Sequence, residues 1–517
     1  MNDRAAGPSI RRRWQRFVLR LQGQLDGETA DRLLPWALAF ATFVLFLALD
    51  AAAERSLDGG SGLGPWLQAV WRRDHGGAGH PMGGLDPAHA TWAFVAEPVL
   101  QLGRLVSPEA VFAVVQAAAL AIAIVPLWRL ARDEARLRVG ATSVVIAAYA
   151  LAPALHRANL TSFHPEAIAL PLLLWAYLQA LRSHWYRYGV LVAAVLLCGA
   201  SLGLTIAGLG LVLFLTGYRR PGWITALVGI AWSAVAVLVL DPQLPTGTLT
   251  PAGEFVARAT GPLAVVPQLL TDPVDQLRQL VAEPAVLFLV LVLAPLLFLP
   301  MVAPRKLSGA LPCLALAMIA DGAVQDAAQR GVINLSPAGA HIAPALAFVF
   351  IALVAALERI GEMSVSRVNV DRRVLFALLA GASLFFLTEA PTSPYRQPWA
   401  WGSQDAVDGA RLDAADLIQG TGPVAVSPSS TSLVAERPVV HELPIDADTL
   451  TDARVRSSTE GVEWVLLDTT GSDRTTGRPF WTDDDADRVL ARLRDEGFRV
   501  VYAAQGVYLL QATPQGS

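Results

Sequence analysis

The sequence LLPWALAFATFVLFLALDAAA, residues 33–53, decides the fold class. An apolar run of this length crosses the hydrocarbon core of a bilayer as an α-helix. It is too long for the apolar core of a signal peptide, and no small-residue cleavage motif comes before polar sequence. We therefore predict that residues 33–53 form the first transmembrane helix and that residues 1–32 are a basic segment before it.

The composition of the whole chain is that of a membrane protein. Of the 517 residues, 54% are hydrophobic and 16% are charged, with a mean hydropathy of +0.44, whereas a soluble protein has about 25% charged residues. The net charge of −4 gives no indication of nucleic acid binding, so no nucleic acid partner is expected. Cys198 and Cys313 both lie inside apolar runs, which excludes a disulfide framework or a zinc site.

Further apolar runs extend the membrane domain to residue 389. The stretch 188–217 is too long for one span, and we divide it at Cys198-Gly-Ala-Ser201, which predicts two short spans. The other runs are bounded by arginine clusters or by Pro and Gly, and lie at residues 108–130, 139–156, 164–182, 222–241, 284–303, 307–321, 341–358 and 374–389. Together they predict about eleven spans.

The basic residues predict the orientation, because Lys and Arg concentrate in cytoplasmic loops. Under this topology the N-terminus is cytoplasmic, residues 54–107 and 242–283 form large outer loops, and residues 390–517 lie outside the membrane. The fold class is then mainly α, a polytopic transmembrane bundle over residues 33–389 with a small extracytoplasmic α/β domain. The basic clusters that set this orientation are Arg11–Arg13, Arg129/Arg132, Arg136/Arg138, Arg182/Arg187, Arg219/Arg220, Arg305/Lys306 and Arg372/Arg373.

The C-terminal region has the pattern of a small α/β domain. Val424–Val426 and Val462–Leu467 are β-rich runs, and Asp484–Glu496 is an amphipathic helix followed by a glycine stop signal. Val500–Tyr502 and Val507–Leu510 suit a closing hairpin. The region has no glycine-rich nucleotide-binding pattern, and its residues predict no catalytic site.

The segment Asn159-Leu-Thr-Ser-Phe163-His164-Pro165-Glu166 is the most specific polar cluster, at the predicted outer mouth between two spans. The start of a helix explains Pro165 and Glu166, since proline and an acid both suit the first turn. It does not explain His164 or Arg157, because ionisable groups at a membrane boundary are usually paired or functional. Both interpretations remain open.

The first outer loop carries a second concentration of candidate residues. Carboxylate and imidazole groups there could hold a divalent cation that neutralises a phosphate leaving group. An ordinary solvated loop is the alternative, and the flexible run His75-Gly-Gly-Ala-Gly-His80 favours it. The candidates are Asp58, Asp74, His75, His80, Asp86 and His89.

The order of these elements resembles a family of predicted bacterial membrane proteins, domain of unknown function 2079, which is similar to the GT-C class of polyprenyl-phosphate-sugar glycosyltransferases. The resemblance implies a protein of the bacterial plasma membrane that contacts membrane lipid and takes a sugar from a polyprenyl phosphate at the outer face. The matching segments are Leu63–Trp71, His89, Pro126–Arg132, Ala158–Glu166, Val424–Ser429 and Arg437-Pro438.

The resemblance also implies roles for individual residues. An outer-loop aspartate would act as general base, with Asp58, Asp74 and Asp86 as the candidates, while His164 and Glu166 would line the pocket. Arg157 would bind the lipid phosphate. The substrate site would further include Asn159, His89, Gln68 and Trp71.

The sequence departs from the family pattern at two places. Two loop aspartates of the family align with Gly62 and Leu67, and a Lys-Glu-Asp cluster aligns with Cys198–Ser201. The chain is then either an enzyme with a relocated acid or a degenerate relative that binds without turnover. A non-enzymatic carrier, flippase or envelope assembly scaffold is the competing class, although the internal hydropathy repeat of many transporters is not evident. The sequence predicts no oligomeric state.

Overall fold

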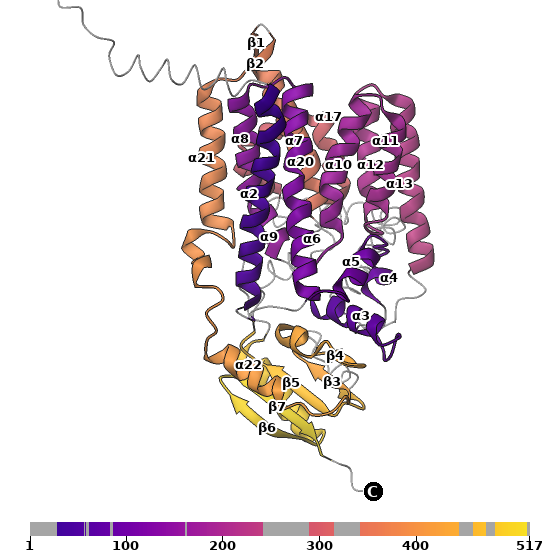
Figure 1. The fold of residues 1–517 in the computed structure, drawn as a ribbon, viewed down its shortest axis with the longest axis vertical. Coiled ribbons are helices and arrows are strands. Elements are labelled where there is room, and N and C mark those ends of the chain that lie inside the picture. The colour runs from indigo at the N-terminus through magenta and orange to yellow at the C-terminus, as the bar shows by residue number, and fades with distance from the viewer. Residues whose placement is uncertain are drawn as a thin grey trace, which may run out of the picture.

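The computed structural model describes residues 28–55, 57, 62–82, 86–160, 163–240, 289–314, 342–364, 366–443, 459–471 and 481–513. A bundle of long helices stands over a smaller unit built on a β-sheet, and short helices lie between the two (Figure 1). We call these parts the helical bundle, the sheet unit and the outer layer.

Four helical segments among the described residues are long and apolar enough to cross a membrane, and a bent pair would make a fifth. The bent pair is α8 (Val139–Ala150) with α9 (Pro153–Leu160), which turns by 45°. The four are α2 (Glu28–Arg55), α6 (Pro108–Ile122) with its continuation through α7 (Ile124–Arg129) and the π-helix η1 (Leu130–Glu134), α20 (Ala343–Ile360) and α21 (Arg372–Glu389). The predicted total of eleven spans stays a prediction.

The bundle is completed by the shorter apolar helices α10 (Glu166–Leu181), α11 (Trp185–Leu196) and α12 (Leu202–Leu215) and by the 22-residue helix α13 (Arg219–Leu240). The predicted break in residues 188–217 is confirmed, since α11 ends at Leu196 and α12 begins at Leu202. Glycines let α12 and α13 pack backbone to backbone: a Cβ on Gly210 would contact the Ala226 nitrogen. Small residues at such contacts are a common device of helix packing in membranes.

The span predicted over 284–303 is interrupted in its described part, and its crossing of the membrane stays a prediction. Residues 294–302 form two short 3-10 helices, η3 (Ala294–Leu296) and η4 (Leu299–Val302), separated by Leu297 and Phe298 in the left-handed region. Proline lacks the N–H that continues a helix, and Pro295 and Pro300 explain the interruption. Two further short elements follow, α17 (Pro304–Leu307) and η5 (Ser308–Ala310).

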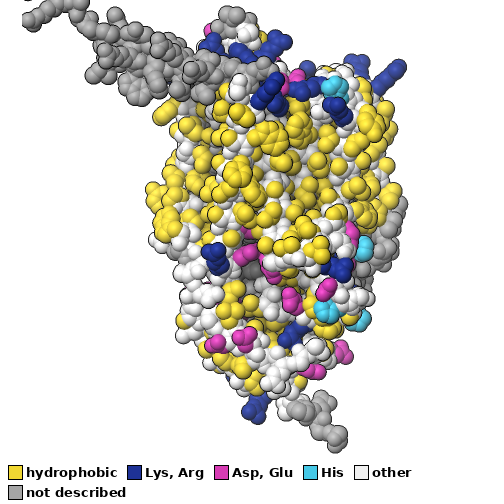
Figure 2. All heavy atoms as spheres, viewed as in Figure 1, with side chains coloured by type: hydrophobic (Ala, Val, Ile, Leu, Met, Phe, Trp, Pro, Cys, Tyr) yellow, Lys and Arg dark blue, Asp and Glu magenta, His cyan; other side chains and the backbone are white. Residues whose placement is uncertain are grey.

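Hydrophobic side chains form a continuous belt across the face of the bundle shown in Figure 2. Lys and Arg side chains gather at the end of the bundle that lies away from the sheet unit. We call this the basic end. There the hairpin of β1 (Glu362–Ser364) and β2 (Arg367–Asn369) adds to the chain at Leu137. The fully buried Arg132 binds Asp31 with a shortest distance of 2.6 Å, and Trp128 Nε1 donates to the same carboxylate. This end of the bundle is thus held by buried ionic contacts.

The sheet unit has five strands in the order β4-β3-β5-β7-β6. Strands β4, β3 and β5 are parallel, and the predicted hairpin of β6 and β7 is confirmed as an antiparallel pair. Helices α22 and α24 belong to separate apolar clusters, one on each side of the sheet. The elements are η7 (Pro394–Arg396), η8 (Pro398–Ala400), α22 (Ala406–Asp416), β3 (Val424–Val426), η9 (Pro428–Val434), β4 (Val440–Glu442), β5 (Trp464–Asp468), α24 (Asp483–Asp495), β6 (Phe498–Ala504) and β7 (Val507–Ala512).

The outer layer consists of α3 (Gly64–Asp74), α4 (Pro87–Ala90) and α5 (Ala96–Gly103), and it lies between the bundle and the sheet unit (Figure 1). Gln68 Nε2 donates to the Arg437 carbonyl at 3.2 Å, and His80 N donates to the Pro438 carbonyl at 2.9 Å. The sheet unit therefore touches the loop that follows α3.

Candidate functional site

A groove with a volume of about 620 Å³ opens in the outer layer. We call it the Arg73 groove. Two of the residues singled out in the sequence, Asp86 and His89, line it. Its polar and aromatic lining residues are Arg72, Arg73, Asp86, His89, Phe94 and Glu97.

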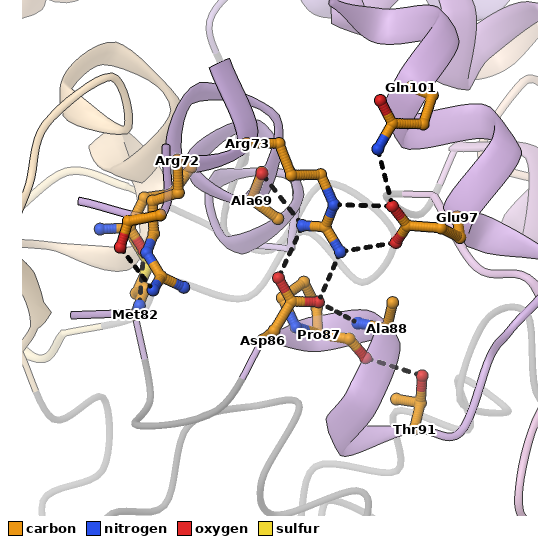
Figure 3. A network of polar contacts seen from close by, with 12 residues as sticks. Ala69, Arg72, Arg73, Met82, Asp86, Pro87, Ala88, Thr91, Glu97 and Gln101 are labelled. Atoms are coloured by element: carbon orange, nitrogen blue, oxygen red, sulfur yellow. Dashed lines mark hydrogen bonds and ion pairs between the residues drawn. The ribbon is translucent and has the colours of Figure 1, made fainter. Parts of the chain in front are cut away.

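Arg73 lies between two carboxylates that come from different elements (Figure 3). Its Nη1 donates to Asp86 Oδ2 and its Nη2 to Glu97 Oε2, each at 2.7 Å. The hydrogen bond from Arg73 lowers the pKa of Glu97, although burial acts in the opposite direction. Charge-assisted pairs of this kind are among the stronger polar contacts in proteins, so Arg73 ties α3 to α4 and α5.

Both oxygens of the Asp86 carboxylate accept hydrogen bonds. Besides Arg73, the carboxylate accepts a hydrogen bond at 3.1 Å from the Ala88 nitrogen and so caps α4. Its side chain is 13% exposed, against 46% for Glu97. A base needs a free lone pair directed at the proton it removes, and the low exposure of Asp86 leaves its carboxylate less accessible than that of Glu97.

Arg72 is the cationic group of the groove that has no carboxylate partner in the part of the chain that the structure describes. The guanidinium of Arg72 donates to main-chain carbonyls of the glycine-rich loop, among them Ala78 at 3.2 Å. These contacts shape the loop, and no carboxylate among the described residues neutralises the charge of Arg72. His89 is exposed, and Phe94, which is 46% exposed, adds an apolar wall.

The other first-loop candidates lie outside this groove. Asp74 ends α3, and its carboxylate is 3.6 Å from Arg104 Nε. Trp71 stacks on His75, with ring centroids 4.1 Å apart. Gln68 is buried, and its side chain accepts from the Met82 nitrogen as well as bonding to the sheet unit. Asp58 lies outside the described residues.

The segment 159–166 is anchored by buried contacts. Phe163 packs against Phe112 and Trp66, with ring centroids 4.9 and 5.1 Å away. Gln116, in the middle of α6, accepts from the His164 nitrogen at 2.8 Å and donates to the Ala158 carbonyl at 2.8 Å. Gln116 was not predicted, and its only signal is a polar residue inside an apolar run.

Two predicted substrate residues also bind main-chain carbonyls. Asn159 Nδ2 donates to the Phe46 carbonyl of α2 at 3.1 Å. Arg157 Nη2 donates at 3.0 Å to the Glu389 carbonyl, the last residue of α21. Both side chains are buried and hold helices together in this structure.

Glu166 begins α10 and is buried, and it meets the turn between α11 and α12. Its Oε1 would lie 3.4 Å from a Cβ at Gly199. The next residue of that turn, Ala200, donates from its nitrogen to the Thr91 carbonyl at 2.8 Å. Glu166 thus lies beside the turn that contacts the segment after His89, and neither Glu166 nor His164 lines the Arg73 groove.

A metal centre has no ready ligand set among these residues. Within the described ranges, no three His, Cys, Asp or Glu side chains come together closely enough to hold an ion. The predicted divalent cation stays a prediction, since Asp58 is not among the residues described.

The apolar helices, the hydrophobic belt and the basic end define a helical membrane protein. The chain belongs to the predicted membrane protein family DUF2079, whose sequence model matches residues 89–509. This match confirms the family named from the sequence, and it includes His89, Glu97, segment 159–166 and nearly all of the sheet unit. No curated protein matches the chain.

Proposed function

We propose that this chain is a GT-C-like protein of the bacterial plasma membrane that binds a polyprenyl-phosphate-linked sugar in the Arg73 groove. One observation carries the proposal. The groove combines Arg72, which has no carboxylate partner among the described residues, with two types of side chain that bind sugars, the carboxylate of Glu97 and the aromatic ring of Phe94. The sheet unit is extracytoplasmic in this proposal, because the opposite end carries the basic residues.

The groove matches such a ligand part by part. The guanidinium of Arg72 suits the phosphate, since arginine binds phosphate oxygens with a planar fork of donors. Glu97 can accept hydrogen bonds from sugar hydroxyl groups, and Phe94 can cover an apolar face of the sugar. Leu102, Leu105 and Val106 follow along α5 and beyond it with exposed fractions of 46%, 82% and 57%, which suits contact with the lipid chain.

A transfer step in this groove needs a proton acceptor. In the reaction, the acceptor hydroxyl oxygen forms a bond to the anomeric carbon while the bond from that carbon to the lipid phosphate oxygen breaks. The phosphate leaves with the electron pair, next to Arg72. We assign the released proton to His89, because its exposed imidazole lines the groove. Glu97 is the weaker base, since its hydrogen bond from Arg73 lowers its pKa.

Native mass spectrometry of the full chain with an added polyprenyl-phosphate hexose tests the binding. The intact protein should retain one lipid, and Arg72→Gln should weaken retention about tenfold, because a hydrogen bond to a charged group contributes roughly 1.5–3 kcal/mol. Arg104→Gln is the matched control, since Arg104 belongs to the same layer but does not line the groove. Equal retention by wild type and Arg72→Gln would refute the assignment.

A non-enzymatic scaffold or carrier is the second candidate. The observation that favours it is the engagement of Asp86 by both Arg73 and the Ala88 nitrogen, which leaves the groove without an uncommitted aspartate. His89→Ala separates the two. Loss of sugar transfer with retained lipid binding supports an enzyme, whereas a cellular function that survives His89→Ala supports the scaffold.

A further inference from the structure

A second groove lies between α10 and α11, at the opposite end of the bundle from the Arg73 groove. Its volume is about 420 Å³. The turn that joins the two helices is at the basic end, because Arg182 in that turn binds Asp133 and Glu134 of η1 at 2.8 and 3.0 Å. The lining residues are Trp175, Gln179, Tyr186, Arg187, Val190 and Leu191.

The lining changes from polar to apolar with depth. Gln179 and Arg187 lie near the turn, whereas Trp175 and Leu191 are each four residues farther along their helices. Four residues of α-helix correspond to about 6 Å along its axis. A charged mouth above an apolar floor has the polarity of one phospholipid, with its head group at the membrane surface and its chains below.

The polar groups at the mouth are available to a ligand. His184 Nδ1 contacts Gln179 Oε1 at 3.0 Å, which leaves the Gln179 amide nitrogen as a donor. In the portion of the chain described, neither this nitrogen nor the Arg187 guanidinium has a protein partner. The neighbouring Arg182 differs, since its charge is neutralised by two carboxylates.

We propose that this groove binds one anionic phospholipid from the leaflet at the basic end. Arg187 and the Gln179 amide hold the phosphate, and an acyl chain lies along Trp175, Val190 and Leu191. Basic pockets between transmembrane helices are a recurrent binding mode for anionic head groups. Tyr186, 85% exposed, adds the aromatic side chain typical of the membrane interface.

Titration of the full chain in detergent with phosphatidylglycerol, followed by native mass spectrometry, tests the site. We expect one tight equivalent for the wild type and an affinity about tenfold lower for Arg187→Gln, since one charge-assisted contact is lost. Phosphatidylcholine should bind more weakly than phosphatidylglycerol. Val190→Trp, which fills the apolar floor, should also weaken binding while the thermal unfolding temperature stays near that of wild type.

Arg220→Gln is the matched control. It removes the same charge at the α12–α13 turn, and Arg220 is exposed but does not line the groove. An equal loss of affinity in Arg187→Gln and Arg220→Gln would overturn the proposal and indicate attraction by the basic surface as a whole. Equal binding of phosphatidylcholine and phosphatidylglycerol would overturn it too. Binding of a polyprenyl phosphate in preference to phosphatidylglycerol would also overturn it, and would show that the groove binds another lipid phosphate. None of these outcomes depends on whether the Arg73 groove binds a lipid-linked sugar.

Discussion

Replacing Arg73 by glutamine should destabilise the outer layer by about 2 kcal/mol at neutral pH. The substitution leaves Asp86 and Glu97 facing each other without the shared cation that now binds both at 2.7 Å. Breaking a fully buried pair costs roughly 3–5 kcal/mol. We reduce that figure because the Glu97 side chain is 46% exposed and is screened by solvent.

The cost of Arg73→Gln should depend on pH in a defined direction. Arg73 lowers the pKa of Glu97, so its contribution to stability is fully present above the ordinary pKa of a glutamate and is lost as the pH falls through the lowered value. The difference between wild type and variant should therefore be largest near neutral pH and should shrink below about pH 4. Differential scanning fluorimetry of the purified protein across this range measures it.

A second substitution separates the ionic contact from loss of packing. Asp86→Asn removes one of the two carboxylates and keeps the cap on α4, since asparagine is also a good N-cap residue. The double variant should therefore recover part of the stability lost by Arg73→Gln. If Arg73→Gln unfolds at the wild-type temperature at neutral pH, the contact is too solvated to hold the outer layer, and this reasoning fails.

Three other substitutions test the surrounding structure. Gln116→Leu should lower the free energy of unfolding by about 1–3 kcal/mol, because the His164 nitrogen and the Ala158 carbonyl lose their partner; unfolding of detergent-purified protein checks this, with Gln511→Leu at an exposed position of β7 as control. Gly210→Val should separate α12 from α13 and reduce the amount of folded protein, which size-exclusion chromatography measures. Gly189→Val is the control and should leave that amount unchanged, because a Cβ at Gly189 meets nothing within 4 Å. Gln68→Ala should speed proteolysis between the bundle and the sheet unit, because it removes a contact to Arg437; an unchanged cleavage rate would count against that contact.

Several elements could be predicted from the sequence because their signals are local. The apolar run at residues 33–53 lies within α2, the small residues at Cys198–Ser201 mark a real break, and the hairpin of β6 and β7 follows its turn sequence. The interruption within residues 284–303 could not be read from hydropathy, because hydropathy does not register the main-chain donors lost at Pro295 and Pro300.

The candidate site was only partly predictable. Asp86 and His89 were found because acids and histidines stand out in an apolar chain. Arg73 and Glu97 were missed because their pairing joins positions 24 residues apart, and the acid before a proline has an ordinary explanation as part of a helix start. The engagement of Gln68, Asn159 and Arg157 in structural contacts is likewise a property of tertiary packing, which residue type alone does not predict.

Photocrosslinking tests the central claim most directly. A polyprenyl phosphate with a diazirine in its first isoprene unit would be added to the full chain in lipid nanodiscs, irradiated, and its attachment site mapped by peptide mass spectrometry. We predict labelling within residues 94–106, which begin at Phe94 in the Arg73 groove and include the exposed Leu102, Leu105 and Val106, and its loss in Arg72→Gln. Labelling confined to other helices, unchanged in Arg72→Gln, would contradict the assignment of this groove as the site for lipid-linked sugar.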